Sequence, residues 1–434
     1  MRVHLVHLGC RSNLYEVEAM ASLLERAGFH LDSASPDLVF LNGCSVTAEA
    51  DRKVRRAISS LRRRYPGAKL VLCGCPAQRM SVEEARALGV SALLGNGLKA
   101  RAVEVASALL GEDAEEPLVL RREGLPEGPL EVLGPGGPRY RTRAFLKVQE
   151  GCRRACSYCV VRILRGLPRS KPVEDVLREV GSLLEAGVRE VVLCGTNLGD
   201  YGVDLGLSLG DLVLALDDLL LGFGARLRLS SLEPFALGEG LLRTLSRCGS
   251  FCPHLHVPIQ SGSSRVLSAM RRGYDRAFLE RALSLVREVL GEDLHLTADL
   301  MVGFPGEEEG DFEESLGLLR SFGFGKVHVF PFSPRPGTEA FGMPPIPSDI
   351  IEDRVKRALQ LSAELERAYA LRLASRGCLF EVLVERERDG FSVGKCREFL
   401  DFRVMGLWGV GSTVLARFVR LEGEEMVGEF ASYL

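Results

Sequence analysis

The 434-residue sequence lacks any apolar run long enough to span a membrane. Its first residues, MRVHLVHLGC, also lack the basic start and the cleavage site of a secretory signal peptide. We therefore expect a cytoplasmic protein with no membrane partner. The net charge of −3 argues against a uniformly basic chain, so any nucleic-acid-binding surface must be local. Structural disulfides are rare in a reducing compartment, so the twelve cysteines should be ligands, nucleophiles or core residues.

Three of these cysteines, Cys152, Cys156 and Cys159, lie in the segment GCRRACSYC with the spacing C-x3-C-x2-C. A disulfide would leave one thiol over. A structural zinc site would need a fourth ligand, but the next histidine downstream is His254 and there is no second C-x2-C pair. Three thiolates instead suit an iron–sulfur cluster with one iron open to a small molecule. The spacing favours the cluster, and zinc is the alternative.

Apolar segments alternate with helical patterns through the middle of the chain. The expected strands are 142–151, 189–195, 225–232, 254–260, 294–304 and 326–332. This alternation predicts a parallel sheet curled into a partial (β/α)6 barrel. Reactive groups of such folds gather at the carboxyl ends of strands, where the triplet and several polar or Gly-rich segments lie.

Three further cysteines each end an apolar run in the N-terminal part. The runs VHLVHLGC, DLVFLNGC and KLVLCGC end at Cys10, Cys44 and Cys75, and helical patterns separate them. An open parallel α/β domain would bring these strand ends to one crevice. Cys73 shares the third run, but Cys75 directly follows a glycine, as Cys10 and Cys44 do. The alternative is that all are ordinary buried core cysteines.

The C-x3-C-x2-C spacing and its surroundings resemble those of the radical SAM enzymes. The resemblance implies a [4Fe–4S] cluster whose open iron binds S-adenosylmethionine, which is cleaved to a 5′-deoxyadenosyl radical. It also implies that residues near the strand ends contact this cofactor; the candidates are Tyr158, Asn197, Glu233, Gln260 and Gly303.

Nearly the whole chain resembles the methylthiotransferase family of these enzymes. The matching segments are LGCRSNLYE, NGCSVTAEADRK, GCPAQ, QEGCRRACSYC, RGLPRS, GTNLGDYGVDL, SSLEP, PIQSGS and MVGFPGE. The resemblance implies a second [4Fe–4S] cluster on Cys10, Cys44 and Cys75 that handles the sulfur, replacement of C–H by C–SCH3, and an electron donor such as flavodoxin or ferredoxin.

The segments look most like the group that acts on N6-threonylcarbamoyladenosine next to the tRNA anticodon. Enzymes that act on isopentenyl-adenosine in tRNA, or on an aspartate of a small-subunit ribosomal protein, are the alternatives within the family. From a different class, a non-catalytic, metal-stabilised RNA-binding protein would also contain cysteine clusters and basic patches.

Two strongly basic runs adjoin the cysteine sets. Residues 139–171 contain ten Lys or Arg and one acid, and residues 52–69 contain eight and no acid. Such runs can be solvated faces, but their position favours a phosphate-bearing partner, hence tRNA. The candidate nucleic-acid-binding residues are Arg62, Arg63, Arg64, Arg141, Arg165 and Arg169.

The C-terminal part reads as short alternating strands with glycine turns, which predicts a small β-barrel. It resembles the RNA-binding TRAM module, although residues 378–434 hold ten acids against seven bases. The expected organisation is an N-terminal α/β domain (1–112), a linker (113–138), the partial barrel (139–370) and the TRAM-like barrel (371–434).

Overall fold

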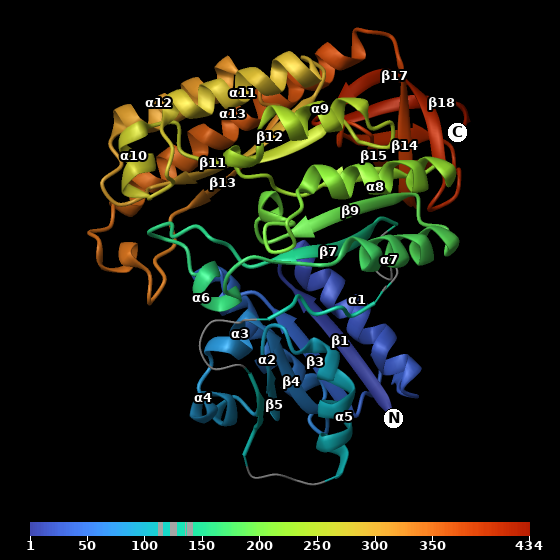
Figure 1. Ribbon diagram of the computed structural model, residues 1–434, viewed down its shortest axis with the longest axis vertical. Helices are drawn as coiled ribbons and strands as arrows, with labels where there is room; N and C mark the ends of the chain where they lie inside the picture. The colour runs from blue at the N-terminus through green and yellow to red at the C-terminus, as the bar shows by residue number, and fades with distance from the viewer. Residues whose placement is uncertain (112–115, 122–127, 135, 137–141) are drawn as a thin grey trace.

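The computed structural model describes residues 1–111, 116–121, 128–134, 136 and 142–434. Figure 1 shows an N-terminal α/β unit in blue beneath a central barrel coloured green to orange. A small C-terminal barrel, in red, lies at one end of the central barrel. In the part of the chain that is described, no helix has the length and apolar character needed to cross a membrane.

The N-terminal unit is a six-stranded parallel sheet with the strand order β2-β1-β3-β4-β5-β6. Its strands are β1 (Arg2–Leu8), β2 (His30–Leu31), β3 (Leu38–Gly43), β4 (Lys69–Gly74), β5 (Ala92–Leu94) and β6 (Leu118–Leu120). Its helices are α1 (Arg11–Arg26), α2 (Ala48–Arg64), α3 (Cys75–Arg79), α4 (Val82–Ala87) and α5 (Ala102–Gly111). The three strands expected before the cysteines are neighbours in this sheet. Because β6 belongs to it, the predicted linker 113–138 contains a strand of the N-terminal unit, and the boundary at 112 is too early.

The central unit contains the six parallel strands that the sequence predicts. They form two hydrogen-bonded groups, and a short antiparallel strand lies at one edge. One group has the order β10-β9-β7-β8 and the other β11-β12-β13. The strands are β7 (Ala144–Glu150), β8 (Arg169–Ser170), β9 (Glu190–Gly195), β10 (Arg226–Leu229), β11 (His254–Gln260), β12 (His295–Val302) and β13 (Lys326–Pro331). The Leu232 amide donates to the His256 carbonyl at 2.9 Å and links the two groups beyond the end of β10.

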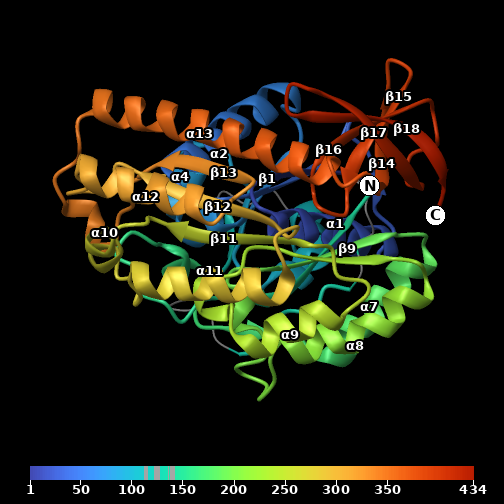
Figure 2. The same ribbon diagram turned by 90° about the horizontal axis from the view of Figure 1, so that it is seen from above.

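Helices cover the outer face of this curved sheet, as Figure 2 shows from above. They are α7 (Val173–Glu185), α8 (Leu209–Gly222), α9 (Glu239–Arg247), α10 (Ser264–Ala269), α11 (Arg276–Leu290), α12 (Glu309–Ser321) and α13 (Ser348–Ala374). The short helix α6 (Val161–Arg165) instead lies against α3 of the N-terminal unit. Short 3-10 turns occur at η1 (Lys99–Arg101), η2 (Leu198–Asp200), η3 (Pro234–Ala236) and η4 (Glu339–Gly342). Helix α1 lies between the N-terminal sheet and the barrel, and its Leu14, Tyr15 and Ala19 belong to the barrel's hydrophobic core.

The C-terminal unit is a closed five-stranded barrel in the order β14-β15-β16-β18-β17. Its strands are β14 (Leu379–Arg388), β15 (Phe391–Cys396), β16 (Asp401–Met405), β17 (Thr413–Glu422) and β18 (Glu425–Tyr433). The predicted small β-barrel is thus present.

A buried ion cluster joins this small barrel to the central one. Glu190 in β9 binds Arg226 at 2.7 Å and Arg228 at 2.9 Å, and Arg143 lies 3.5 Å away. Arg226 also donates to the carboxylate of Glu381 in β14 at 3.1 Å. Burial alone would raise the pKa of Glu190, but the three arginines together hold it well below its ordinary value. Glu190 therefore stays ionised and compensates the cations that bind the C-terminal unit.

We expect Glu190→Gln to destabilise the fold, because three buried guanidinium groups would lose their shared counter-charge. Removing one partner of a buried ion pair costs about 3–5 kcal/mol. The depressed pKa means that the contribution of Glu190 is present above the ordinary glutamate pKa of 4.5 and is lost as the pH falls below it. Thermal unfolding should therefore separate wild type from variant most at neutral pH, and the difference should narrow progressively as the pH falls below 4.5. Exposed Glu239→Gln is the control, and equal melting temperatures at neutral pH for wild type and Glu190→Gln would contradict this role.

Candidate functional site

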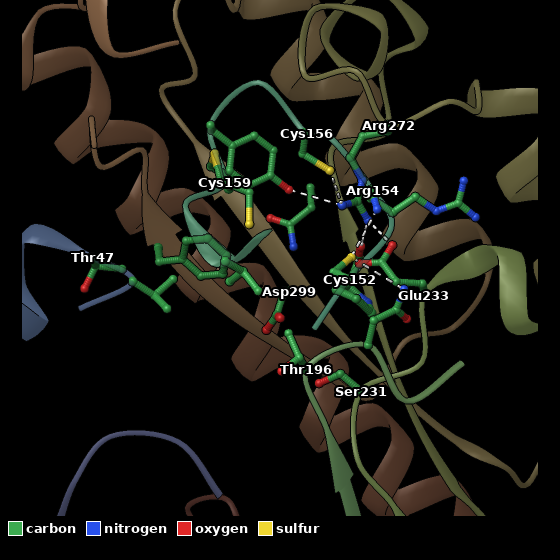
Figure 3. Close-up of a pocket in the computed structure, with 18 of the residues that line it drawn as sticks. Thr47, Cys152, Arg154, Cys156, Cys159, Thr196, Ser231, Glu233, Arg272 and Asp299 are labelled. Carbon is green, nitrogen blue, oxygen red and sulfur yellow. Dashed lines mark hydrogen bonds and ion pairs between the residues drawn. The ribbon is translucent and has the colours of Figure 1, made fainter. Parts of the chain in front are cut away.

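The cysteine triplet lies in the loop that follows β7 and borders a cavity of about 270 Å³. Residues at or near the carboxyl ends of the six parallel strands line this cavity, as the fold predicts. Besides the three cysteines, the polar and charged residues that line the cavity are Thr47, Arg154, Tyr158, Arg162, Thr196, Asn197, Ser231, Glu233, Gln260, Arg272, Asp299 and Ser333. Figure 3 shows Cys152 and Cys156 beside Glu233 and Arg272, whereas Cys159 lies farther toward the side of Thr47, which belongs to the N-terminal unit.

Four of the five predicted cofactor contacts line the cavity: Tyr158, Asn197, Glu233 and Gln260. Asn197 Oδ1 and Gln260 Oε1 are buried without a hydrogen-bond partner among the described residues, and Gln260 adopts the unusual φ of 65°. Unpaired buried acceptors and strained backbone both cost free energy, so they are typical of a site completed by a ligand.

Gly303, the fifth, is not among the residues that line this cavity. Its amide donates to Glu307 at 2.8 Å, and a Cβ on it would come within 2.6 Å of Ile351. Its positive φ of 77° instead suits the tight turn after β12.

Arg272 organises this wall of the cavity, and sequence reasoning missed it. It is buried and forms an ion pair with Glu233. It also donates to the Tyr158 hydroxyl at 3.2 Å, the Cys156 thiol at 3.5 Å and the Pro258 carbonyl at 3.1 Å. Arg272 follows helix α10 rather than a strand, so no strand-end pattern marks it.

The N-terminal cysteines also converge, because β1, β3 and β4 are adjacent. Burial, together with the nearby thiols of Cys75 and Cys10, raises the pKa of Cys44 to about 12. A Cβ at Gly9 would lie 2.9 Å from the Cys44 Cβ, so the close approach depends on glycine there. Cys73 points into the opposite core of the sheet, where it packs with apolar residues, which agrees with the choice of Cys75.

The two cysteine sets lie on either side of a short shared wall. Cys75 packs against Val160 and Leu164, which directly follow the triplet. Asn96 donates to the Leu164 carbonyl at 3.0 Å and lies 3.7 Å from the Cys75 thiol. Val46 and Thr47, just after Cys44, line the triplet's cavity. The Arg335 guanidinium holds this segment by donating to the Ser45 carbonyl at 2.9 Å.

The chemistry of both thiol sets fits iron–sulfur clusters. Burial and the neighbouring thiols raise the pKa of Cys159 to about 12, as they do for Cys44. Such thiols become thiolates only when a bound cation compensates them, and cluster iron supplies that charge. Among the described residues, no three Cys, His, Asp or Glu side chains are placed to hold a single metal ion.

Two of the predicted nucleic-acid contacts are wrong. Arg165 and Arg169 are buried, and each binds Glu150 at 2.9 Å. They are counter-ions of a buried carboxylate and cannot form an exposed phosphate-binding surface. Arg141 lies outside the described residues.

The cations at the end of α2 are partly exposed. Arg62 donates to the Ala68 carbonyl at 3.3 Å and packs beside Gly89, whereas Arg63 and Arg64 are exposed. All three lie at the opposite end of α2 from Thr47, which borders the cavity. They remain candidates for RNA contact.

Comparisons with known proteins agree with this architecture. Residues 146–319 match the radical SAM superfamily, and residues 2–95 match the uncharacterized protein family UPF0004. The fold resembles the radical S-adenosylmethionine methyltransferase TsrM from Kitasatospora setae, with a TM-score of 0.56, 17% identity and coverage of 78% of this chain and 77% of that one. The fold and the cysteine-lined cavity define a radical SAM enzyme.

Close relatives identify the family. The chain is 36% identical to the threonylcarbamoyladenosine tRNA methylthiotransferase MtaB of Thermotoga maritima, over 86% of this chain and 84% of the relative. It is 34% identical to MtaB of Chlamydia pneumoniae, over 98% and 97%. It is 35% identical to the tRNA-2-methylthio-N(6)-dimethylallyladenosine synthase of Moorella thermoacetica, over 88% and 86%. The chain belongs to the methylthiotransferase family of radical SAM enzymes, which use S-adenosylmethionine and [4Fe–4S] clusters.

We expect Arg272→Lys to weaken use of S-adenosylmethionine, because one ammonium group cannot replace a guanidinium that orients Glu233, Tyr158 and Cys156 together. Losing one charge-assisted hydrogen bond costs about 1.5–3 kcal/mol, so the KM for S-adenosylmethionine should rise about tenfold or more. Iron content should change little. The matched control is Arg271→Lys, next in the chain but exposed and paired with Glu339. A wild-type KM in Arg272→Lys would contradict this role.

Proposed function

We propose that this enzyme converts N6-threonylcarbamoyladenosine in tRNA to its 2-methylthio derivative. Relatives named for this activity match the chain over most of both lengths. The dimethylallyladenosine synthase of Moorella thermoacetica is similarly identical, so N6-dimethylallyladenosine is the second candidate substrate.

The observation that carries the proposal is the pair of three-thiol sets. One set lines the cavity, and Val46 and Thr47, which follow Cys44 of the other set, line the same cavity. We propose that Cys152, Cys156 and Cys159 hold the cluster that binds S-adenosylmethionine. Cys10, Cys44 and Cys75 would hold the auxiliary cluster. When bound, these groups would supply a carbon-centred radical and a sulfur for transfer.

The chain's own residues would bind and orient the reactants. Arg272 fixes the Glu233 carboxylate and the Tyr158 hydroxyl against the triplet. Asn197 and Gln260 offer their unpaired oxygens to donor groups of the cofactor. Val46 and Thr47 cover the side of the cavity nearest Cys44, which keeps water away from the reacting atoms.

We also propose an external electron donor, a small acidic carrier such as flavodoxin or ferredoxin. The triplet's loop carries Arg153, a half-exposed cation that would attract an acidic protein. For tRNA, we propose the exposed face of α2, where Arg52, Lys53, Arg56, Arg63 and Arg64 lie within one arc of the helix.

The function is tested with reconstituted enzyme, S-adenosylmethionine, a reductant and anticodon stem–loop RNAs. Mass spectrometry should find the methylthio group on the stem–loop with N6-threonylcarbamoyladenosine. A Cys10, Cys44, Cys75→Ala triple variant should still form 5′-deoxyadenosine, hold about half the iron, and transfer no sulfur, because only one three-thiolate site remains.

Exposed Cys378→Ala is the matched control for the cysteine variant and should behave as wild type. Exclusive modification of a dimethylallyladenosine stem–loop would assign the second substrate. Full iron content or normal sulfur transfer in the triple variant would refute the auxiliary site.

Replacing Arg63 and Arg64 by Glu should weaken tRNA binding and flatten its dependence on salt. The logarithmic slope should fall by about one unit for each phosphate that the variant no longer neutralises. Fluorescence anisotropy with labelled tRNA at several salt concentrations measures both effects. Arg247 and Arg281, exposed on α9 and α11, form the control pair for the same charge reversal. If deletion of residues 378–434 abolishes binding while the α2 variant binds as wild type, the C-terminal barrel is the principal RNA contact.

A further inference from the structure

A chain of hydrogen bonds runs through the barrel interior to one carboxylate in the cavity wall. His254 Nε2 and the Thr297 hydroxyl are 3.0 Å apart, and the same hydroxyl is 2.8 Å from His256 Nδ1. His256 Nε2 in turn lies 3.0 Å from Asp299 Oδ1. Three of these residues are buried, and Asp299 lines the cavity with its side chain 27% exposed.

The proton positions in this chain of hydrogen bonds follow from Asp299, the residue at its end. An ionised carboxylate only accepts hydrogen bonds, so His256 Nε2 must donate to Asp299. His256 Nδ1 can then either accept the Thr297 proton or donate to the Thr297 oxygen. In both arrangements Asp299 accepts a hydrogen bond from His256 Nε2. The hydrogen-bond chain therefore fixes the rotamer of Asp299 and occupies one of its two carboxylate oxygens.

The second oxygen, Asp299 Oδ2, has no hydrogen-bond partner within the described part of the chain. Arg272, the buried arginine in the cavity wall, does not donate to this oxygen, because it forms an ion pair with Glu233. Arg154 instead stacks over Phe235 at 3.7 Å. A carboxylate oxygen that borders a cavity and has no partner is stabilised when the occupant donates a hydrogen bond to it.

The position of Asp299 indicates which occupant that is. The proposed cofactor contacts follow β7, β9, β10 and β11, whereas Asp299 lies in β12. Its neighbours along the cavity wall are Phe330 and Ser333 from the β13 side. Val46 and Thr47, which follow Cys44 and Ser45 in the sequence, line the same cavity. Asp299 therefore shares the cavity with the triplet and with the segment that follows Cys44.

We propose that Asp299 binds the modified nucleobase of the substrate by accepting a hydrogen bond from an N–H or O–H group of its N6 substituent. His256, Thr297 and His254 are positioning residues that hold Asp299 in place. This inference rests on the proposed function, since it assumes a nucleoside substrate in the cavity. It adds a substrate contact from β12 that the strand-end pattern did not reveal.

The test compares Asp299→Asn with wild type, because asparagine keeps the shape and can still accept from His256. Reconstituted enzyme is given stem–loops with either N6-threonylcarbamoyladenosine or unmodified adenosine. Wild type should bind the modified stem–loop more tightly. Asp299→Asn should lose that preference by about 10- to 100-fold, the range for a hydrogen bond to a charged group. The yield of methylthio product per 5′-deoxyadenosine should fall with it.

The positioning residues are tested by conservative changes. Thr297→Val should reduce the same two quantities to a smaller extent, and Thr297→Ser should restore them because it returns the hydroxyl. His30→Asn is the control, since His30 is an exposed histidine in β2 of the N-terminal sheet. Iron content and circular dichroism establish that each variant is folded.

Three results are separable. If wild type modifies neither candidate stem–loop, the proposed function is wrong. If wild type modifies its substrate and Asp299→Asn keeps normal binding preference and product yield, the role of Asp299 is wrong. If Asp299→Asn loses 5′-deoxyadenosine formation without RNA as strongly as it loses product, Asp299 serves the cofactor, and the inference is overturned.

Discussion

The arrangement depends on a buried network of charges that holds the N-terminal unit against the barrel. Glu16 of α1 binds Lys147 of β7 at 2.7 Å, and Lys99 lies 3.5 Å away. Lys147 also lies 3.5 Å from Glu150, the residue just before the triplet's loop. A lone charge at these positions would be prohibitively costly, so the carboxylates and cations favour one relative placement of the two units. That placement brings Cys75 against Val160 and Leu164.

The buried charge network illustrates which features of the structure can be predicted from the sequence and which cannot. Cysteine spacing and strand-end position depend on local pattern, so the two thiol sets and the barrel were predictable. The basic run 139–171 was misread in part, because counting charges does not reveal which of them are buried. Glu150, the single acid in that run, is the residue that binds Arg165 and Arg169. A lone acid at the end of an apolar strand could have signalled this.

Arg272 and Asp299, the site residues that sequence reasoning missed, have no comparable signal in the sequence. Arg272 reaches the cavity from the loop after α10, and Asp299 lies within a strand, where period-two alternation gives it no distinction. Their roles follow from contacts between segments far apart in the chain. Neither one sequence nor its periodicity contains those contacts.

The C-terminal barrel contributes to the same construction. Phe399 stacks on His254 with ring centroids 4.7 Å apart and adopts a φ of 70°, rare for a bulky residue. The Glu398 carbonyl lies 2.6 Å from His295 Nδ1. The small barrel thus closes the amino-terminal end of the central one, beneath the histidines that lead to Asp299. Whatever RNA it binds, it is also a structural part of the catalytic unit.

The central claim is that two cysteine sets from separate units hold clusters close together across a wall formed by Val160 and Leu164. Electron paramagnetic resonance of the fully reduced, reconstituted enzyme tests it most directly. Two clusters separated by the thin wall of Val160 and Leu164 should couple magnetically, giving a broadened, fast-relaxing signal. That signal should collapse to a simple single-cluster spectrum when either cysteine set is replaced by alanine. A wild-type spectrum equal to the sum of the two single-cluster spectra would contradict this close placement.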